Sequence, residues 1–232
     1  MSAGAQTPPP TEIEVEPAGR PAVCHEVVDP ADNEAVAWLG SLFAAGRADL
    51  YAQDEADLNL LPSLTRTWMP RGEQLKVRAP GTNAKRSVSA ATDLAAGDVL
   101  WRTDERRCAD QFCATLHECA ERSTARGRLA VLLVDNAQGH RVGKTGIVRR
   151  ALNALAGQVV LIFLPAYSPD LQPGERLWRQ WRPNVTHNHK RADIADLVAD
   201  SDAWLTTAAD DPKGVLLMLG SNVKPQPDSK AA

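Results

Sequence analysis

Apolar residues in the front half of the chain follow two patterns, which predict one helix and then a set of strands. Between residues 32 and 45 they recur at helical spacing and Gly46 follows, which predicts a leading helix within 31–47. Residues 50–60 alternate apolar and acidic side chains up to Pro62, which predicts a strand. Short stretches separated by turn-forming residues predict further antiparallel strands at 75–77, 86–92 and 99–102.

The rear half of the chain alternates fully apolar runs with helical patterns. Residues 129–134 and 159–164 are continuous apolar runs, as in strands that are buried on both faces of a sheet. Helical spacing predicts helices at 108–126, 145–156, 175–181 and 191–208. This alternation predicts an α/β fold, a mixed sheet with helices on both faces, within a domain over 48–209.

The two ends of the chain have a different composition. Residues 1–30 hold six prolines among small and polar residues, which cannot bury enough apolar surface to offset chain entropy, so we expect a disordered Pro-rich arm. Residues 210–232 follow the last predicted helix, and we expect a C-terminal tail there. No apolar run approaches the length of a membrane span and no secretory signal is recognisable, so we expect a cytoplasmic protein with no membrane partner.

Positive charge is concentrated in one block of a chain whose formal net charge is −3. Residues 141–192 hold nine lysines and arginines against two acids. Neutralising phosphates is the sequence-independent part of DNA affinity, so the block predicts a face that contacts double-stranded DNA; a solvated helix face is the alternative. The candidate DNA-binding residues are Arg141, Lys144, Arg149, Arg150, Arg179 and Arg182.

Three acids fall at the predicted strand and helix ends in a way that brings carboxylates together. Asp54 lies in the first long strand, Asp135 directly follows the run 129–134, and Glu175 begins the helix after the next strand. We expect these side chains to converge at one edge of the sheet. Two divalent ions held by carboxylates can hydrolyse or transfer a phosphodiester, and magnesium prefers such oxygen ligands. Solvated acids or helix caps are the alternative interpretation of this pattern.

Two segments around these acids carry a specific resemblance. LAVLLVDNAQGH at 129–140 and LPAYSPDLQPGERLW at 164–178 closely resemble the signature of the D-D-E superfamily transposases, in the insertion sequence 630 family that is related to mariner. Upstream, Asp54 and Glu55 resemble the first catalytic strand of that family, and residues 184–188 resemble its segment after the catalytic helix. The resemblance covers about residues 48–206.

The resemblance implies an RNase H-like catalytic domain that uses two Mg²⁺ ions, with Mn²⁺ possible in their place. It implies Asp54, Asp135 and Glu175 as catalytic residues and metal ligands, with Asn136 and His140 in supporting roles. It also implies DNA partners, namely the element ends and the target, a homodimer in synapsis, and a nucleoid-associated location in the cytoplasm.

The chain departs from the family pattern in two places. Gly174 stands before the third acid where the family has a branched apolar residue, and we expect it to loosen the start of the helix. The family's N-terminal helix-turn-helix domains have no counterpart before residue 50, so we expect an upstream helix-turn-helix polypeptide to recognise the element ends. A frameshifted half, a truncated remnant and a domesticated fragment remain open.

Two other functions are compatible with parts of the sequence. Residues 139–145, GHRVGKT, resemble a P-loop, but the pattern needs a glycine where Gln138 stands. A catalytically inert remnant that only binds DNA would keep the fold without the chemistry. The tryptophans, Trp68 included, are expected in the core, and stacking on bases is kept as an alternative for Trp181 alone.

Overall fold

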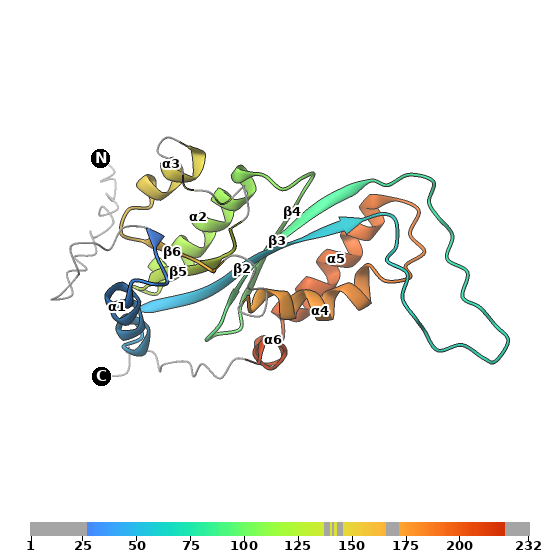
Figure 1. The fold of residues 1–232 in the computed structure, drawn as a ribbon, viewed down its shortest axis with the longest axis horizontal. Coiled ribbons are helices and arrows are strands. Elements are labelled where there is room, and N and C mark those ends of the chain that lie inside the picture. The colour runs from blue at the N-terminus through green and yellow to red at the C-terminus, as the bar shows by residue number, and fades with distance from the viewer. Residues whose placement is uncertain (1–26, 137–139, 141, 143–145, 166–171, 221–232) are drawn as a thin grey trace, which may run out of the picture.

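A computed structural model of the chain describes residues 27–136, 140, 142, 146–165 and 172–220. The described residues form a six-stranded mixed sheet in the order β1-β6-β5-β2-β3-β4, with helices around it (Figure 1). The strands are β1 (Val27–Val28), β2 (Ala48–Asn59), β3 (Lys85–Asp93), β4 (Val99–Asp104), β5 (Leu129–Val134) and β6 (Val159–Phe163). The helices are α1 (Asn33–Ala44), α2 (Ala109–Ala125), α3 (Ile147–Ala154), α4 (Gly174–Val185), α5 (Ile194–Ala209) and α6 (Pro212–Leu219).

The long strand β2 joins the parallel and the antiparallel parts of the sheet. It pairs with β5 in parallel only as far as Ala52, which lies opposite Leu133. Its antiparallel pairing with β3 continues to Asn59. Beyond Ala52, β2 therefore has a neighbouring strand on one side only among the described residues, and we call its other edge the open edge.

Helices cover both faces of the sheet, which confirms the predicted architecture. Successive strand residues point to opposite faces, so Tyr51 packs with α2 and α3 while Ala52 packs on the side of α4, α5 and α6. Helix α1 covers the same side as Ala52, over Val131 and Val160. Figure 1 shows α2 and α3 on one side of the sheet and α4, α5 and α6 on the other. Fully buried side chains on both sides make a two-sided core around the strands.

One predicted strand is wrong. Residues 75–77 are not part of the sheet and lie within the long extended segment that joins β2 to β3 (Figure 1). The two apolar side chains, Leu75 and Val77, cannot bury enough surface to recruit a neighbouring strand, and the flanking turn residues do not supply one. The other predicted strands and the predicted helices are present.

Both ends of the described chain hold an element where none was expected. Val27–Val28 pairs with β6 as an added parallel strand, and Val28 is buried, inside the range for which composition predicted disorder. Pro212–Leu219 is a helix within the predicted tail; it begins at the cap Asp211 and ends at Gly220 in the left-handed conformation. Both elements are short, so the few apolar residues in each give little indication in the sequence of the packing that stabilises them. Residues 1–26 and 221–232 lie outside the described residues. Among the described helices, none has the length and the apolar composition needed to cross a membrane.

Candidate functional site

The three predicted acids lie around the C-terminal end of β5. Asp135 directly follows the last residue of β5, and Asp54 lies two residues beyond Ala52, where the pairing of β2 with β5 ends. The parallel register therefore brings Asp54 and Asp135 to the same level of the sheet. Glu175 is in the first turn of α4, which packs on the Ala52 side of β2.

The start of α4 approaches β2 closely, and Gly174 makes this approach possible. A Cβ at position 174 would stand 2.8 Å from the Cβ of Asp54, closer than side-chain carbons pack. The expectation that this glycine loosens the helix is wrong, since α4 begins at Gly174 and the residue is buried. The glycine is needed because any larger residue would push Glu175 away from Asp54.

The pKa of Asp54 is shifted by its surroundings. Burial, together with the nearby carboxylates of Glu175 and Asp135, raises the pKa of Asp54 to about 6. The main-chain N–H of Glu55 donates to its Oδ1 at 2.8 Å and favours the charged form, but it does not offset the burial. The surroundings of Asp54 therefore disfavour its charged form more than they favour it.

Glu175 is paired with a base on its own helix. The guanidinium of Arg182 donates to Oε1 of Glu175 at 2.7 Å, and both side chains are about one-third exposed, at 37% and 30%. Among the described residues, no three His, Cys, Asp or Glu side chains stand close enough together to hold a metal ion. The carboxylates are thus neighbours but do not converge, and Glu175 is held in an ion pair with Arg182.

The donor set itself suits a divalent cation. Asp54, Asp135 and Glu175 offer only hard carboxylate oxygens, which are the ligands that magnesium and manganese take. The raised pKa of Asp54 reports a charge that a bound cation would neutralise.

His140 is a buried bridge between two acids. Its Nδ1 lies 2.7 Å from Oδ1 of Asp135 and its Nε2 lies 3.1 Å from Oε1 of Glu55, while its ring packs on Phe112 with centroids 4.3 Å apart. Burial alone would lower the pKa of His140, but the hydrogen bonds to Asp135 and Glu55 raise it to about 9. His140 is therefore protonated at neutral pH, and it holds the Asp135 carboxylate in place.

Glu55 is the partner that the motif alone did not assign. It is 6% exposed in its side chain and also pairs with Arg107 at 3.4 Å, so it lies between two cations. Asn136 donates to the main-chain oxygen of Leu164 and joins the ends of β5 and β6. Gln172 donates to the main-chain oxygen of Gln53 at 2.9 Å, which ties the start of α4 to β2 beside Asp54. Sequence reasoning missed Arg107 and Gln172, because neither lies in a spacing that marks a site.

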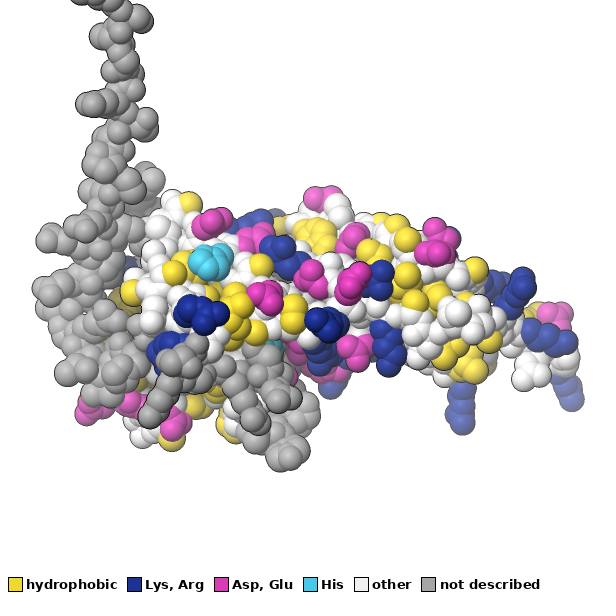
Figure 2. Space-filling view, turned by 90° about the horizontal axis from the view of Figure 1, so that it is seen from above, with side chains coloured by type: hydrophobic (Ala, Val, Ile, Leu, Met, Phe, Trp, Pro, Cys, Tyr) yellow, Lys and Arg dark blue, Asp and Glu magenta, His cyan; other side chains and the backbone are white. Residues whose placement is uncertain are grey.

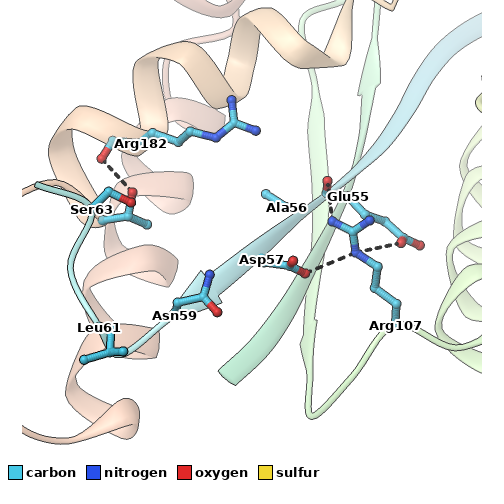
Figure 3. Close-up of a pocket in the computed structure, with 9 residues that line it drawn as sticks. Glu55, Ala56, Asp57, Asn59, Leu61, Ser63, Arg107 and Arg182 are labelled. Atoms are coloured by element: carbon cyan, nitrogen blue, oxygen red, sulfur yellow. Dashed lines mark hydrogen bonds and ion pairs between the residues drawn. The ribbon is translucent and has the colours of Figure 1, made fainter. Parts of the chain in front are cut away.

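A polar groove runs along the open edge of β2. Its volume is about 270 Å³. Figure 3 shows Arg107 and Arg182 on the two sides of the strand, with Glu55, Asp57 and Asn59 between them along β2. The groove ends at Leu61 and Ser63, where the chain leaves β2. It therefore leads from the neighbourhood of the acids to the start of the β2–β3 connection.

Buried acids elsewhere are paired directly with arginines, although burial raises the pKa of Asp93 as well. Asp49 and Asp93 lie near the other end of β2 and are almost fully buried. Arg126 contacts both carboxylates, at 3.4 and 3.1 Å, and Arg128 contacts Asp49 at 2.9 Å. These acids join α2 to the sheet, so burial of an acid does not by itself mark a functional site.

The predicted DNA-binding residues are divided between the two sides of the sheet. Arg149 and Arg150 are on α3, whereas Arg179 and Arg182 are on α4, across the sheet. Arg141 and Lys144 lie outside the described residues. Trp181 is fully buried, and its Nε1 donates to Ser201 at 3.1 Å, which confirms its expected place in the core and excludes the alternative of stacking on bases. Trp68, expected in the core, is fully exposed.

Known protein families and sequences are similar to most of this chain. The sequence profile of the family described as DDE superfamily endonuclease matches residues 49–198. A relative is the insertion element IS630 uncharacterized 39 kDa protein of Shigella sonnei, which is 25% identical over 197 residues, or 84% of this chain and 56% of the relative.

Solved structures share the fold at low sequence identity. The Mos1 mariner paired end complex with Mn has a TM-score of 0.51 and 17% identity, over 78% of this chain and 58% of that chain. A pre-cleavage Mos1 transpososome has a TM-score of 0.52 and 16% identity, over 80% of this chain and 58% of that chain. The chain thus spans a little over half the length of these relatives, and the similarity confirms the RNase H-like fold.

Proposed function

Because the chain belongs to the DDE superfamily endonucleases, we propose that it is the catalytic domain of a DNA transposase of the insertion sequence 630 and mariner type. Its substrate is double-stranded DNA, and its reaction is metal-dependent hydrolysis of phosphodiesters at element ends followed by strand transfer into a target. The observation that carries this proposal is the position of Asp54, Asp135 and Glu175 at one edge of the sheet, with the pKa of Asp54 raised to about 6.

In this proposal Asp54, Asp135 and Glu175 would hold two divalent cations, Mg²⁺ or Mn²⁺. Bound cations would activate the attacking oxygen and stabilise the leaving oxygen of the phosphodiester. The chain's own residues position the ligands: His140 fixes one carboxylate oxygen of Asp135, and Gly174 lets Glu175 approach Asp54. Arg182 pairs with the Glu175 carboxylate.

The assembly of the active complex is part of the same proposal. The Mos1 relatives are paired end complexes, which supports two copies of this chain acting together on two DNA ends. An upstream helix-turn-helix polypeptide that recognises those ends stays a prediction. The P-loop alternative is not favoured by the family match, and most of its residues, 139–145, lie outside the described part of the chain.

Nicking of a supercoiled plasmid in Mg²⁺ tests the proposed chemistry. Asp135→Asn should lower the nicking rate by more than about a hundredfold, because loss of a residue that only supports a metal ligand already costs up to about that much. Asp196→Asn, an exposed acid on α5, is the matched control and should nick as the wild type does. Binding of Mn²⁺, followed by electron paramagnetic resonance, should weaken in Asp135→Asn only.

Two results would contradict the proposal. Unchanged nicking in Asp135→Asn removes the assigned site. A wild-type chain that binds DNA but neither nicks it nor binds Mn²⁺ is the inert, DNA-binding remnant.

A further inference from the structure

The connection between β2 and β3 is an exposed arm with apolar side chains at its surface. We define the arm as residues 61–83; the main-chain N–H of Leu60 donates to Ala84 at 2.9 Å and closes its base. Trp68 is 100% exposed, Leu64 is 75% exposed and Met69 is 40% exposed. Large apolar side chains are seldom left fully in water without a partner, so the arm has the composition of a contact surface.

The arm is also basic. It carries four exposed bases against a single acid, Glu73. Figure 2 shows Lys and Arg side chains along the end of the molecule at which the arm extends in Figure 1. The exposed bases are Arg66, Arg71, Lys76 and Arg78. Because two such arms repel each other, this charge favours a polyanion over the arm of a second copy.

Asn188 fixes the start of the arm to the helix that carries Glu175. It lies just beyond α4 with φ at +50°, a conformation that asparagine tolerates better than most residues. Its Nδ2 donates to the main-chain oxygen of Thr65 and its Oδ1 accepts from the N–H of Thr65, at 3.1 and 3.0 Å. Its own N–H donates to Ser63 at 3.0 Å. The arm therefore leaves the domain from a defined position.

The groove and β2 link this position to the acids. The groove includes Glu55 next to Asp54, Arg182 that bonds Glu175, and Ser63 at the start of the arm. Asp54 and Leu60 are six residues apart on an extended strand, which is about 20 Å. A DNA strand advances about 3.4 Å per nucleotide, so DNA cut at the acids would meet the arm about six nucleotides away.

We propose that the arm is a DNA-binding element, in which Arg66 and Arg71 contact the backbone and Trp68 stacks on a base that is unpaired where the DNA meets the arm. The inference rests on the proposed function, because the acids define where the DNA is cut. Arginines on either side of an exposed indole combine the two contacts that bind single-stranded and frayed DNA, namely phosphate neutralisation and base stacking.

Binding of the full chain to a labelled duplex with a short unpaired 3′ end, followed by fluorescence anisotropy in chelator, tests the arm. Trp68→Ala should weaken binding about tenfold, as expected for loss of one stacked base, and Trp68→Phe should keep most of the affinity. Arg66→Gln with Arg71→Gln should lower the slope of log affinity against log salt by about two. Lys213→Gln with Leu217→Ala, which removes one base and one exposed apolar side chain from α6, should leave binding unchanged.

Two outcomes would overturn the proposal. The first is DNA affinity and salt slope that equal the wild type in all the arm variants. The second is a wild-type dimer that Trp68→Ala converts to a monomer at unchanged DNA affinity, which would assign the arm to a second copy of the chain. Mn²⁺ binding and Asp135-dependent nicking are measured on the same proteins; their absence in the wild type would instead refute the proposed function.

Discussion

Single residues set how closely the carboxylates of the candidate site approach one another. The acids themselves were predictable from the sequence, because Asp135 and Glu175 lie in motifs at the end of an apolar run and the start of a helix. The roles of Gly174 and Glu55 were not predictable, since each depends on a residue far away in the sequence, Asp54 for the first and His140 for the second. Spacing along the chain contains no information on such contacts.

The closest of these contacts gives a test at Gly174. Gly174→Ala places a Cβ 2.8 Å from that of Asp54, so α4 must shift. We expect a loss of roughly 1–3 kcal/mol in the free energy of unfolding, the usual cost of overpacking, and slower nicking because Glu175 moves with the helix. Urea unfolding and the plasmid assay measure the two effects.

Gly40→Ala is the matched control for this substitution. Gly40 is in α1 with nothing within 4 Å of an added Cβ, so alanine there should raise the free energy of unfolding by roughly 0.5–1 kcal/mol. Equal and small effects at both glycines would mean that the start of α4 tolerates a side chain and that Gly174 does not position Glu175.

His140 gives a test that depends on pH. In the folded protein its pKa is about 9, above its usual value near 6.5, so the stability that it adds is complete below about pH 6.5 and is lost as the pH rises through 9. His140→Gln should therefore lower the free energy of unfolding by about 1–3 kcal/mol at pH 6 in chelator, and by less at pH 9.5. Urea titrations at the two pH values measure the difference, and a loss that does not change with pH would contradict a protonated bridge between Asp135 and Glu55.

Whole elements were predictable where one continuous signal identified them. The apolar runs 129–134 and 159–164 are buried strands because apolar side chains on both faces demand helices on both sides. Residues 75–77 hold only two apolar side chains, which are partly buried, and no described strand lies beside them. The expected burial is right for Trp181 and wrong for Trp68, because a tryptophan's burial depends on its neighbours in space, which local spacing does not reveal.

The connection between α4 and the arm can be tested at Asn188. Both Asn188→Ala and Asn188→Gly remove the side-chain hydrogen bonds to Thr65, so hydrogen exchange at the Thr65 amide should become faster in both. Only alanine adds backbone strain at φ +50°, so Asn188→Ala should also lose about 1 kcal/mol relative to Asn188→Gly. Unchanged exchange at Thr65 would show that the start of the arm is held by other contacts.

At the scale of the molecule, basic residues that are close in the sequence are not gathered on one face of the fold. The basic block predicted one DNA-contacting face, yet its described members on α3 and α4 lie on opposite sides of the sheet. The exposed bases of the arm belong to a segment that the block did not include. Folding therefore separates charges that are adjacent in sequence, and the DNA path is better inferred from the open edge of β2.

The stability of the whole domain should report the uncompensated charge at that edge. Because the folded-state pKa of Asp54 is raised to about 6 from 3.8, its charge costs stability that is fully felt above pH 6 and disappears below about pH 4. In chelator at pH 8, Asp54→Asn should therefore raise the free energy of unfolding by about 1–3 kcal/mol, whereas Asp49→Asn should lower it, because Asp49 holds Arg126 and Arg128.

Divalent cations should reverse the order of wild type and Asp54→Asn. A cation that binds only the folded state stabilises it in proportion to the logarithm of its concentration, so Mg²⁺ should raise the melting temperature of the wild type and leave Asp54→Asn nearly unchanged. Calorimetry at pH 8 with and without Mg²⁺ measures both shifts. Equal shifts in the two proteins would mean that the cation does not bind at Asp54 and would contradict the assigned site.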